Sequence, residues 1–462
     1  MEVKTYIFLV HKVRNAQRND AMICTFQKNA LILNPKVNTS ITKRILTDKY
    51  FMKIYRILLF MLGVAGLLSC SKDDNSDEEN PNRTILAYIA GENSLSSFAL
   101  ADFREMAEGM EHVDGNNHLL VYLDTKESAQ LPAIYHLYKD KKSGAVVQET
   151  LYTYPEQDAS SVTLERMEDV FRRSFEAYPA ESYGLILWSH GEGWLPGTTS
   201  RLRSFGQDGG NSGPVMEIAD LDEAISLGTT YLGEARHFDF IYFDACFMQG
   251  IEVAYQLRNY TDYLIGCPLE TPGPGAPYDR ILSPLFERGE ANVVGMAETY
   301  YQVYEEAYNG GQNGSNANWT YGAAISVVRM AALENLAGET SRLYAKYADR
   351  MAQLSADDLA SVQIFDANRR YGGTYKHAYY DFGDFVRSIA TESEYALWEQ
   401  QLDQAVVYAA STPTCYSVYY QGGGNMPIRA FSGLSTYVPL TDENYSAWNE
   451  AYEALDWANA VK

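Results

Sequence analysis

The chain has 462 residues, of which 46% are hydrophobic and 13% aromatic, so it can bury a large core and is not globally disordered. A formal net charge of −23 argues against a general nucleic-acid binder, because phosphate contacts need clusters of Lys and Arg. The five cysteines form no CxxC pair, which argues against a cysteine-ligated zinc site, and they are too few for a disulfide scaffold.

The segment MKIYRILLFMLGVAGLLSC, which begins at Met52, predicts a signal peptide over residues 52–69. It has a basic start and an apolar run shorter than the roughly 20 residues of a membrane-spanning helix. Its ending, LLSC, resembles a bacterial lipobox, which implies cleavage before Cys70 and lipid attachment to that residue. An ordinary secretory signal is the alternative. We expect residues 1–51 to be an upstream extension outside the folded protein.

After Cys70 the chain continues with SKDDNSDEENPNR, which is acidic and lacks large apolar residues, so residues 70–82 are predicted to be a flexible tether. A Lys followed by acidic residues directly after the lipidated cysteine resembles the surface-export signal of Bacteroidetes lipoproteins. We therefore expect a protein anchored to the membrane through Cys70 in the bacterial cell envelope. The outer membrane is the expected place, and exposure on the cell surface is left open.

Residues 83–462 are expected to form one domain in which strands alternate with helices. In chain order, we predict a strand at 84–91, a helix at 93–110, a strand at 117–125, a hairpin at 133–155, a helix at 163–179, a strand at 183–191, a capped helix at 218–228, a strand at 238–246, a helix at 250–260 and a strand at 262–268. Short, continuously apolar strands between helices predict an α/β fold with an open, mostly parallel sheet flanked by helices.

The remainder, from about residue 290, carries helices rich in Tyr and Ala and a few apolar segments. It is expected to complete the same domain or to pack tightly on it. The stretch YQGGGNMP, residues 420–427, is expected to be a loop.

Two strand ends carry the candidate chemistry, because functional groups in such sheets gather at the carboxyl ends of the strands. One reads LILWSHG and ends at His190 and Gly191, and the other reads FIYFDAC and ends at Asp244 and Cys246. A thiol becomes a nucleophile when a base favours the thiolate, and the N–H of a glycine can face a developing oxyanion. Taken singly, the cysteine could be buried and inert and the His-Gly a turn.

These two motifs and their flanks resemble the clostripain-like cysteine peptidases, in the clan of caspases, gingipains and legumains. The similarity covers about residues 83–440 and includes TILAYIAGENSLSSFALADFREM, LILWSHGEGW, FDFIYFDACFMQGIEVAYQL, TPGPGAPYDRIL, YYDFGDFVRSI and SGLSTYVP. The resemblance implies a caspase-like fold and a cysteine endopeptidase with a Cys–His dyad that works through an acyl-enzyme.

Position by position, the resemblance makes Cys246 the nucleophile and His190 the general acid and base. The oxyanion would be held by the backbone N–H groups of Gly191 and Cys246. Asp244 matches a position that recognises a basic residue before the scissile bond, which implies cleavage after Arg or Lys. The alternative for Asp244 is a structural carboxylate that accepts backbone N–H groups at the strand end.

Some positions leave more than one interpretation open. Glu270 does not align securely with the second specificity carboxylate of the family. Glu192 could orient the histidine or simply solvate its loop, and we favour the second. Cys267 could be a spectator thiol or could pair with Cys415.

The segment between the two motifs, residues 195–214, is long, polar and rich in glycine, as good proteolytic sites are. Some relatives cleave themselves in this loop, and Arg201 and Arg203 fit the expected basic specificity. A flexible lid that is never cut is the alternative.

No metal or cofactor is required for this chemistry, and the resemblance leaves calcium dependence open. The expected partners are protein or peptide substrates and the membrane, with no nucleic acid. One rival function is a non-catalytic lipoprotein that binds peptides or proteins on the same fold. A glycan-active lipoprotein is disfavoured, because the carboxylates form no distinctive constellation.

Overall fold

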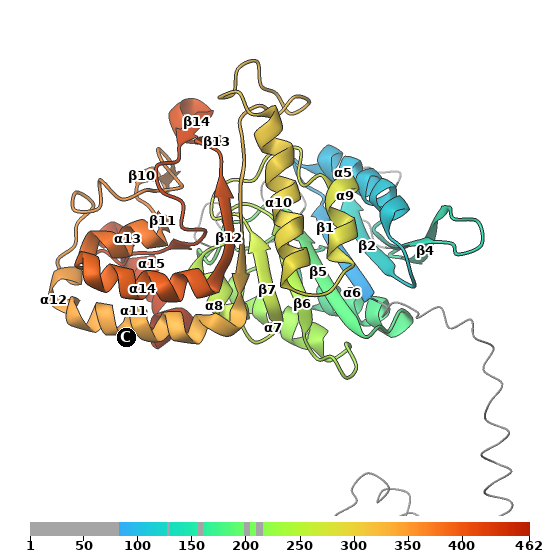
Figure 1. Ribbon diagram of the computed structural model, residues 1–462, viewed down its shortest axis with the longest axis horizontal. Coiled ribbons are helices and arrows are strands. Elements are labelled where there is room, and N and C mark those ends of the chain that lie inside the picture. The colour runs from blue at the N-terminus through green and yellow to red at the C-terminus, as the bar shows by residue number, and fades with distance from the viewer. Residues whose placement is uncertain (1–82, 127–129, 156–159, 198–203, 209–215) are drawn as a thin grey trace, which may run out of the picture. The chain divides into compact units, whose positions relative to one another are not determined.

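The computed structural model describes residues 83–126, 130–155, 160–197, 204–208 and 216–462 (Figure 1). The predicted extension, signal peptide and tether, with Cys70, lie outside the described residues, as do Arg201 and Arg203. Within the described part of the chain, we find no helix with both the length and the apolar character that a membrane span requires.

A nine-stranded sheet forms the centre of the fold, in the order β12-β8-β7-β6-β5-β1-β2-β3-β4. Its strands are β1 (Arg83–Gly91), β2 (His118–Thr125), β3 (Ala133–Lys139), β4 (Val146–Thr153), β5 (Ser182–Trp188), β6 (Phe238–Asp244), β7 (Thr261–Gly266), β8 (Ala324–Arg329) and β12 (Val406–Ser411). The five strands from β7 to β2 run parallel, and the outer pairs β3–β4 and β8–β12 join antiparallel. The predicted open, mostly parallel sheet is therefore confirmed.

Helices cover both faces of this sheet, which explains why its central strands are apolar along their whole length (Figure 1). One face packs against α5 (Ser96–Gly109), α9 (Tyr278–Leu285) and α10 (Glu290–Ala307). The other packs against α6 (Leu164–Ala177), α7 (Ile218–Thr229) and α8 (Ile251–Leu257). In β6, Phe240 and Tyr242 enter the first core while Ile241 and Phe243 enter the second, as strand alternation requires.

The C-terminal part adds two strands, β8 and β12, to the sheet and a group of helices beside it. These helices are α11 (Leu333–Lys346), α12 (Ala348–Met351), α13 (Phe382–Ile389), α14 (Glu392–Ala405), α15 (Ser446–Glu453) and α16 (Asp456–Ala460). Three small antiparallel pairs complete the strands: β9 (Arg370–Tyr371) with β10 (Thr374–Tyr375), β11 (Tyr380–Asp381) with β15 (Ser435–Thr436), and β13 (Thr414–Ser417) with β14 (Gly424–Pro427). The 3₁₀ turns are η1 (Met110–His112), η2 (Met330–Ala332), η3 (Tyr420–Gly422) and η4 (Glu443–Tyr445).

Three details of the predicted elements are wrong. Residues 420–427 are not a plain loop, because η3 turns the chain and β14 then pairs with β13 in the register Ser417↔Gly424. The start of α7 has no side-chain cap, since the carboxylate of its N-cap residue Glu217 accepts the N–H of Gly197 (2.9 Å) instead. The helix predicted at 250–260 is also shorter, at Ile251–Leu257.

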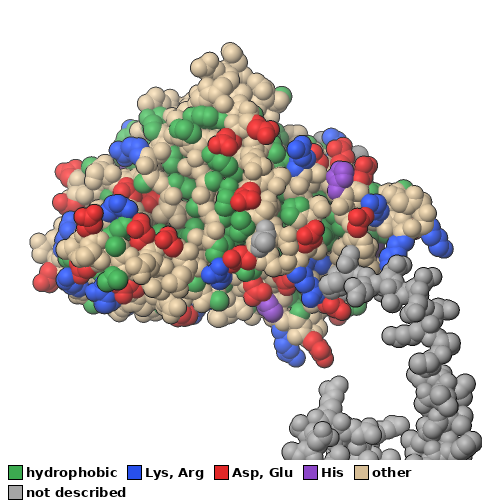
Figure 2. Space-filling model, in the orientation of Figure 1, with side chains coloured by type: hydrophobic (Ala, Val, Ile, Leu, Met, Phe, Trp, Pro, Cys, Tyr) green, Lys and Arg blue, Asp and Glu red, His purple; other side chains and the backbone are tan. Residues whose placement is uncertain are grey.

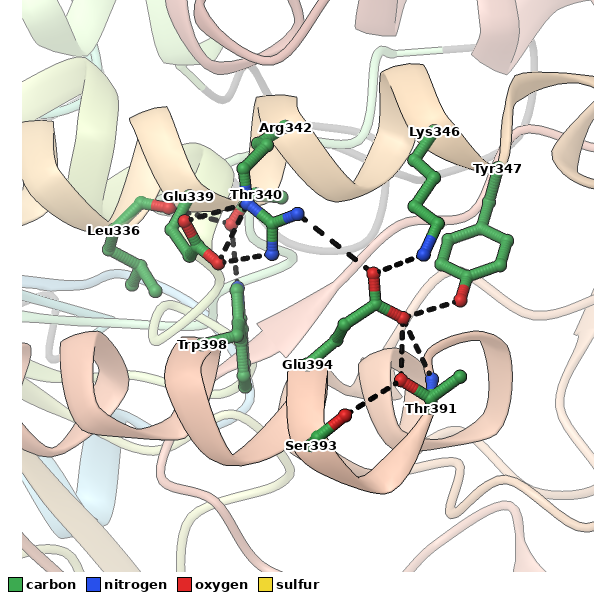
Figure 3. A network of polar contacts seen from close by, with 10 residues as sticks. All are labelled: Leu336, Glu339, Thr340, Arg342, Lys346, Tyr347, Thr391, Ser393, Glu394 and Trp398. Atoms are coloured by element: carbon green, nitrogen blue, oxygen red, sulfur yellow. Dashed lines mark hydrogen bonds and ion pairs between the residues drawn. The ribbon is translucent and has the colours of Figure 1, made fainter.

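Polar contacts join α11 to α14 through Glu394 (Figure 3). Its carboxylate accepts from Lys346 Nζ (2.5 Å) and the Tyr347 hydroxyl (2.6 Å) on or just after α11, and with Thr391 it forms a capping box at the start of α14. Beneath this network Trp398 Nε1 donates to Thr340 Oγ1 (2.8 Å). These contacts fix the register of two helices that cover the C-terminal part of the core.

Figure 2 shows acidic and basic side chains interspersed over one face of the molecule, without a broad basic patch on that face.

The contact between Gly184 in β5 and Phe240 in β6 generates a stability prediction. A β-carbon at Gly184 would lie 2.3 Å from Cζ of the fully buried Phe240 ring. We expect Gly184→Ala to lower the free energy of unfolding by about 1–3 kcal/mol, since it overpacks a filled core. The measurement is the urea midpoint of unfolding.

Gly338→Ala is the matched control, because Gly338 lies within α11 and a β-carbon there meets nothing within 4 Å. That variant should gain up to about 1 kcal/mol from helix propensity. Equal effects of the two substitutions would contradict the packing argument.

Candidate active site

Strands β5 and β6 are parallel neighbours whose register places Trp188 opposite Asp244. Both strands end at these residues. His190 and Cys246 therefore follow two residues beyond paired positions, at the same edge of the sheet. The prediction that the two motifs occupy adjacent strand ends is confirmed.

Gly191 lets the two strand ends approach each other. A β-carbon at this position would lie 2.4 Å from the carbonyl oxygen of Cys246, closer than any side chain tolerates. On the other strand end, Phe247 has a φ of +60°, so the chain turns sharply directly after the cysteine. The N–H of Phe247 donates to the carbonyl of Leu269 (3.0 Å), which holds this turn.

A cavity of about 250 Å³ opens between the two strand ends. It contains the four predicted site residues that the structure describes: His190, Gly191, Asp244 and Cys246. The other lining residues are Leu95, Trp188, Ser189, Glu192, Phe247, Glu270, Thr271, Pro272, Gly273, Gly275, Asn316, Trp319, Tyr416, Val418 and Tyr419. The loop after β7 and the start of the β13–β14 connection thus form the cavity wall together with the two motifs.

The Cys246 thiol is half-buried and contacts the loop after β7. Its Sγ lies 3.4 Å from both the backbone N and the Oγ1 of Thr271. Burial raises the pKa of the thiol to about 12, and the nearby charge of Glu270 adds to the shift. Cys246 is therefore a neutral thiol in the free protein at neutral pH.

The His190 ring is held by a hydroxyl. Its Nε2 lies 2.9 Å from Ser94 Oγ. Burial lowers the pKa of His190, and the charge of Lys126 lowers it further, so the ring is neutral near pH 7. Among the described residues, no hydrogen bond joins this ring to the Cys246 thiol.

Ser94 owes its place to Asn93, which is buried at the end of β1. The Asn93 side-chain amide donates to the carbonyls of Ala90 (2.9 Å) and Gln207 (2.8 Å), and its Oδ1 accepts the N–H of Leu95 (2.8 Å). Ser94 and Thr271 were not found from the sequence. The available signal was position, since each follows a strand that ends at the same edge of the sheet.

The backbone N–H groups of Gly191 and Cys246 donate to no other described residue. On either side of Gly191, the backbone is tied to residues 204–206: Glu192 N donates to Ser204 O and Gly206 N to His190 O, each at 2.9 Å. The two predicted oxyanion donors thus have no acceptor within the described part of the chain, and the backbone beside Gly191 is held in place.

Asp244 makes the hydrogen bonds of a structural carboxylate and also lines the cavity. Only 4% of it is exposed. Its Oδ2 accepts the N–H of Ala276 (3.1 Å) and the hydroxyl of Tyr278 (2.9 Å), and no described residue donates to Oδ1. Burial raises the pKa of this carboxyl group.

A second buried carboxyl group, Asp102 in α5, lies behind Asp244 and was not found from the sequence. Its Oδ2 accepts the indole N–H of Trp188 (2.6 Å) and packs against Gly275, which has a φ of +79°. Burial, and then the charge of Asp244, raises the pKa of Asp102 far enough for it to hold a proton at neutral pH. Asp244 is therefore the carboxylate of this pair that is more readily ionised.

Glu192 neither orients His190 nor solvates its loop, so both interpretations were wrong. Its Oε1 forms an ion pair with Nη2 of Arg369 at 2.6 Å, and Arg369 itself is buried. Glu270 also lines the cavity, and its Oε1 accepts the N–H of Val418 (3.1 Å). The Glu192–Arg369 ion pair was not predicted from the sequence, because its two residues lie 177 positions apart and no local pattern links them.

Cys267 and Cys415 are both buried and both free thiols. Burial raises the pKa of each, so neither resembles a reactive thiolate.

Among the residues that the structure describes, two groups of side chains each bring three possible metal ligands within 4.8 Å of one another: His237, Asp239 and Asp262, and Glu92, Asp124 and Asp208. In the first group, Asp239 pairs with Arg83 and His237 with Asp262. In the second, Asp124 and Asp208 both accept hydrogen bonds from Ser161. Side chains in both groups thus already have partners within the protein.

Comparison with known proteins identifies relatives along nearly the whole described chain. The model of the Clostripain family, peptidase family C11, matches residues 87–462. Clostripain of Hathewaya histolytica is 23% identical over 458 residues, which cover 85% of this chain and 83% of that protein.

Two solved structures are more similar in sequence. A secreted C11 cysteine protease from Bacteroides thetaiotaomicron, determined in complex with an irreversible peptide inhibitor, is 39% identical with a TM-score of 0.71. An inactive zymogen C11 protease from Parabacteroides distasonis is 34% identical with a TM-score of 0.67. Each match covers 83% of this chain and 99% of the other. The family model and the two solved structures each match most of this chain, so the chain belongs to the clostripain family of cysteine proteases.

Proposed function

We propose that this protease cleaves peptide bonds after Arg or Lys, with Cys246 as the nucleophile and His190 as the general acid and base. The observation that supports the proposal best is the shared cavity, in which a thiol, an imidazole and the Asp244 carboxylate meet at two paired strand ends. The substrates are proteins or peptides that bind in an extended form.

The resting protonation states determine the order of events. Since the Cys246 thiol and the His190 ring are both neutral, the thiol must lose its proton as sulfur attacks the carbonyl carbon. The His190 ring takes that proton and then gives it to the leaving amine, so that the peptide bond breaks and an acyl-enzyme forms. Water, activated by the same ring, releases the acid product and restores the thiol.

The tetrahedral intermediate carries a negative oxygen, which the free N–H groups of Gly191 and Cys246 are suited to hold. Both are backbone groups on ordered strand ends, so they need little reorganisation when the charge develops. No metal is part of this cycle.

Asp244 supports recognition of a basic side chain. Hydrogen bonds from Ala276 and Tyr278 fix one carboxylate oxygen and leave the other without a protein donor among the described residues. Trp188 and Trp319 line the same cavity and offer apolar surface to the methylene stem of Lys or Arg. A carboxylate below apolar walls fits a long cationic side chain better than a short neutral one.

Fluorogenic peptides that end in Arg, Lys, Asn or Ala test both parts of the proposal. We expect turnover of the Arg and Lys peptides, and a loss of at least about 10³-fold in kcat for Cys246→Ala and for His190→Ala. Asp244→Asn should lower kcat/KM for the basic peptides by about 10²-fold or more, because it removes a buried charge partner.

The outcomes separate the parts of the proposal. Wild-type activity that survives in Cys246→Ala would sink the nucleophile assignment. Turnover of the Asn peptide alone would sink the Asp244 assignment. Binding of peptides without any turnover would favour the non-catalytic alternative.

Self-cleavage in the 195–214 segment is part of the proposal. Its supports are the two basic residues Arg201 and Arg203 and the attachment of residues 204–206 to the backbone on either side of Gly191. A cut after Arg201 or Arg203 would create a new chain end just before residues 204–206, which are bound to the backbone beside His190. The structure of the Parabacteroides relative is described as an inactive zymogen, so control by processing has a precedent in the family.

The purified wild-type chain should give fragments cut after Arg201 or Arg203, as read by intact mass. The matched controls are Cys246→Ala, which should stay uncut on its own but be cut when wild type is added, and the Arg201→Ala/Arg203→Ala variant. A wild-type chain that stays whole while it cleaves peptides would overturn self-processing and leave the peptidase proposal intact.

Attachment to the cell envelope through a lipid on Cys70 is the last part of the proposal. Its support is the lipobox-like sequence, and one relative from Bacteroides is described as secreted. Expressed from Met52 in a Bacteroides host, the wild type should partition with membranes, whereas Cys70→Ala should be released into the soluble fraction. Equal partitioning of the two forms would contradict a lipid anchor at this residue.

A further inference from the structure

Arg369 is a buried cation within reach of the catalytic groups. Only 4% of it is exposed, and its Nη2 lies 2.6 Å from Glu192 Oε1. Its guanidinium lies over three aromatic rings, at 4.3 Å from Tyr419, 4.7 Å from Tyr371 and 5.5 Å from Phe247. A cation removed from water in this way costs free energy unless it has a charge partner, and Glu192 is that partner.

Both members of this pair connect to the strand ends that carry the catalytic groups. Glu192 is two residues beyond His190, and its carbonyl accepts the hydroxyl of Tyr379 (2.7 Å). The Tyr379 ring stacks on Phe247, the residue after Cys246, with ring centroids 4.5 Å apart. Segment 366–379 therefore holds the backbone after the histidine and the side chain after the cysteine at the same time.

The charges around the thiol make Glu192 more than a structural anchor. Glu192 and Glu270 line the cavity with Cys246, and the negative charges of both raise the pKa of the thiol. Arg369 forms an ion pair with Glu192 and so offsets the charge of that carboxylate. Without Arg369, the charge of Glu192 would act uncompensated on a sulfur that must become negative during attack.

We infer that the Arg369–Glu192 ion pair is a positioning and charge-compensating device for the nucleophile. Arg369 cancels the charge of Glu192 beside Cys246 and so keeps thiolate formation within reach. This inference rests on the proposed role of Cys246. A purely structural pair would leave the reactivity of the thiol unchanged when either of its two charges is removed alone.

The test is the rate at which iodoacetamide alkylates Cys246 between about pH 6 and about pH 10, without substrate, measured by mass spectrometry of its peptide. Cys246→Ala supplies the background from the other cysteines. In wild type the rate should climb through this range without a plateau near pH 7, because the thiolate fraction of a thiol with raised pKa grows with pH.

Four variants separate charge from packing. Glu192→Gln leaves the Arg369 charge uncancelled, so its profile should move to lower pH by about one unit, or about tenfold in rate on the rising limb. Arg369→Met leaves Glu192 uncancelled and should move the profile to higher pH by a similar amount. The double variant should return close to wild type, and Arg369→Lys, which keeps the charge, should stay close to it.

Glu290→Gln is the matched control, since it breaks the Glu290–Arg329 pair (2.5 Å) in another part of the fold. It should leave the alkylation profile unchanged. A Glu192→Gln profile that coincides with wild type overturns the inference, even if Arg369→Met fails to fold. So does a double variant that is as slow as Arg369→Met.

These readings do not depend on peptide turnover. Shifted profiles in a protein that cleaves no peptide would count against the proposed function and in favour of the ion-pair inference. Normal turnover of basic peptides with superimposable profiles would do the opposite.

Discussion

The parallel pairing of β5 with β6 is the constraint on which the site depends. Because Trp188 stands opposite Asp244, the two chains leave the sheet at the same level, and Gly191 packs against the carbonyl of Cys246. A slip of one residue in this register would turn the side chains of one strand to the wrong face of the sheet. Two cores, one on each face, make such a slip costly because every residue of both strands is buried except Asp239.

Burial disfavours the charged forms of both Cys246 and His190, and the surrounding residues partly offset this effect at the thiol. A thiol enclosed beside carboxylates resists ionisation, and an enclosed histidine resists protonation, so the resting pair is neutral. In the proposed cycle, charge therefore appears only when substrate is bound, where the backbone N–H groups of Gly191 and Cys246 can receive it. The cation that pairs with the nearby Glu192 comes from Arg369, far along the chain.

Features encoded by neighbouring residues were predicted from the sequence, whereas contacts between residues far apart in the chain were not. Continuous apolar runs marked the central strands, and the polar residues directly after them marked His190 and Cys246. The pairs Glu192–Arg369 and Ser94–His190 join residues 177 and 96 positions apart, and no local pattern encodes such contacts. The strand at 424–427 was missed for a related reason, since the glycines at positions 422–424 favour a turn and only pairing with β13 makes the strand extended.

The Asp102–Asp244 pair shows why the two interpretations of Asp244 need not compete. Two carboxyl groups buried together cannot both ionise readily, and the one that keeps a proton is Asp102, behind the cavity wall. Hydrogen bonds from Ala276 and Tyr278 stabilise the charge on Asp244 at one oxygen. The structural bonds thus help to keep a single carboxylate ionised at the cavity, which is the state that recognition of a cationic side chain requires.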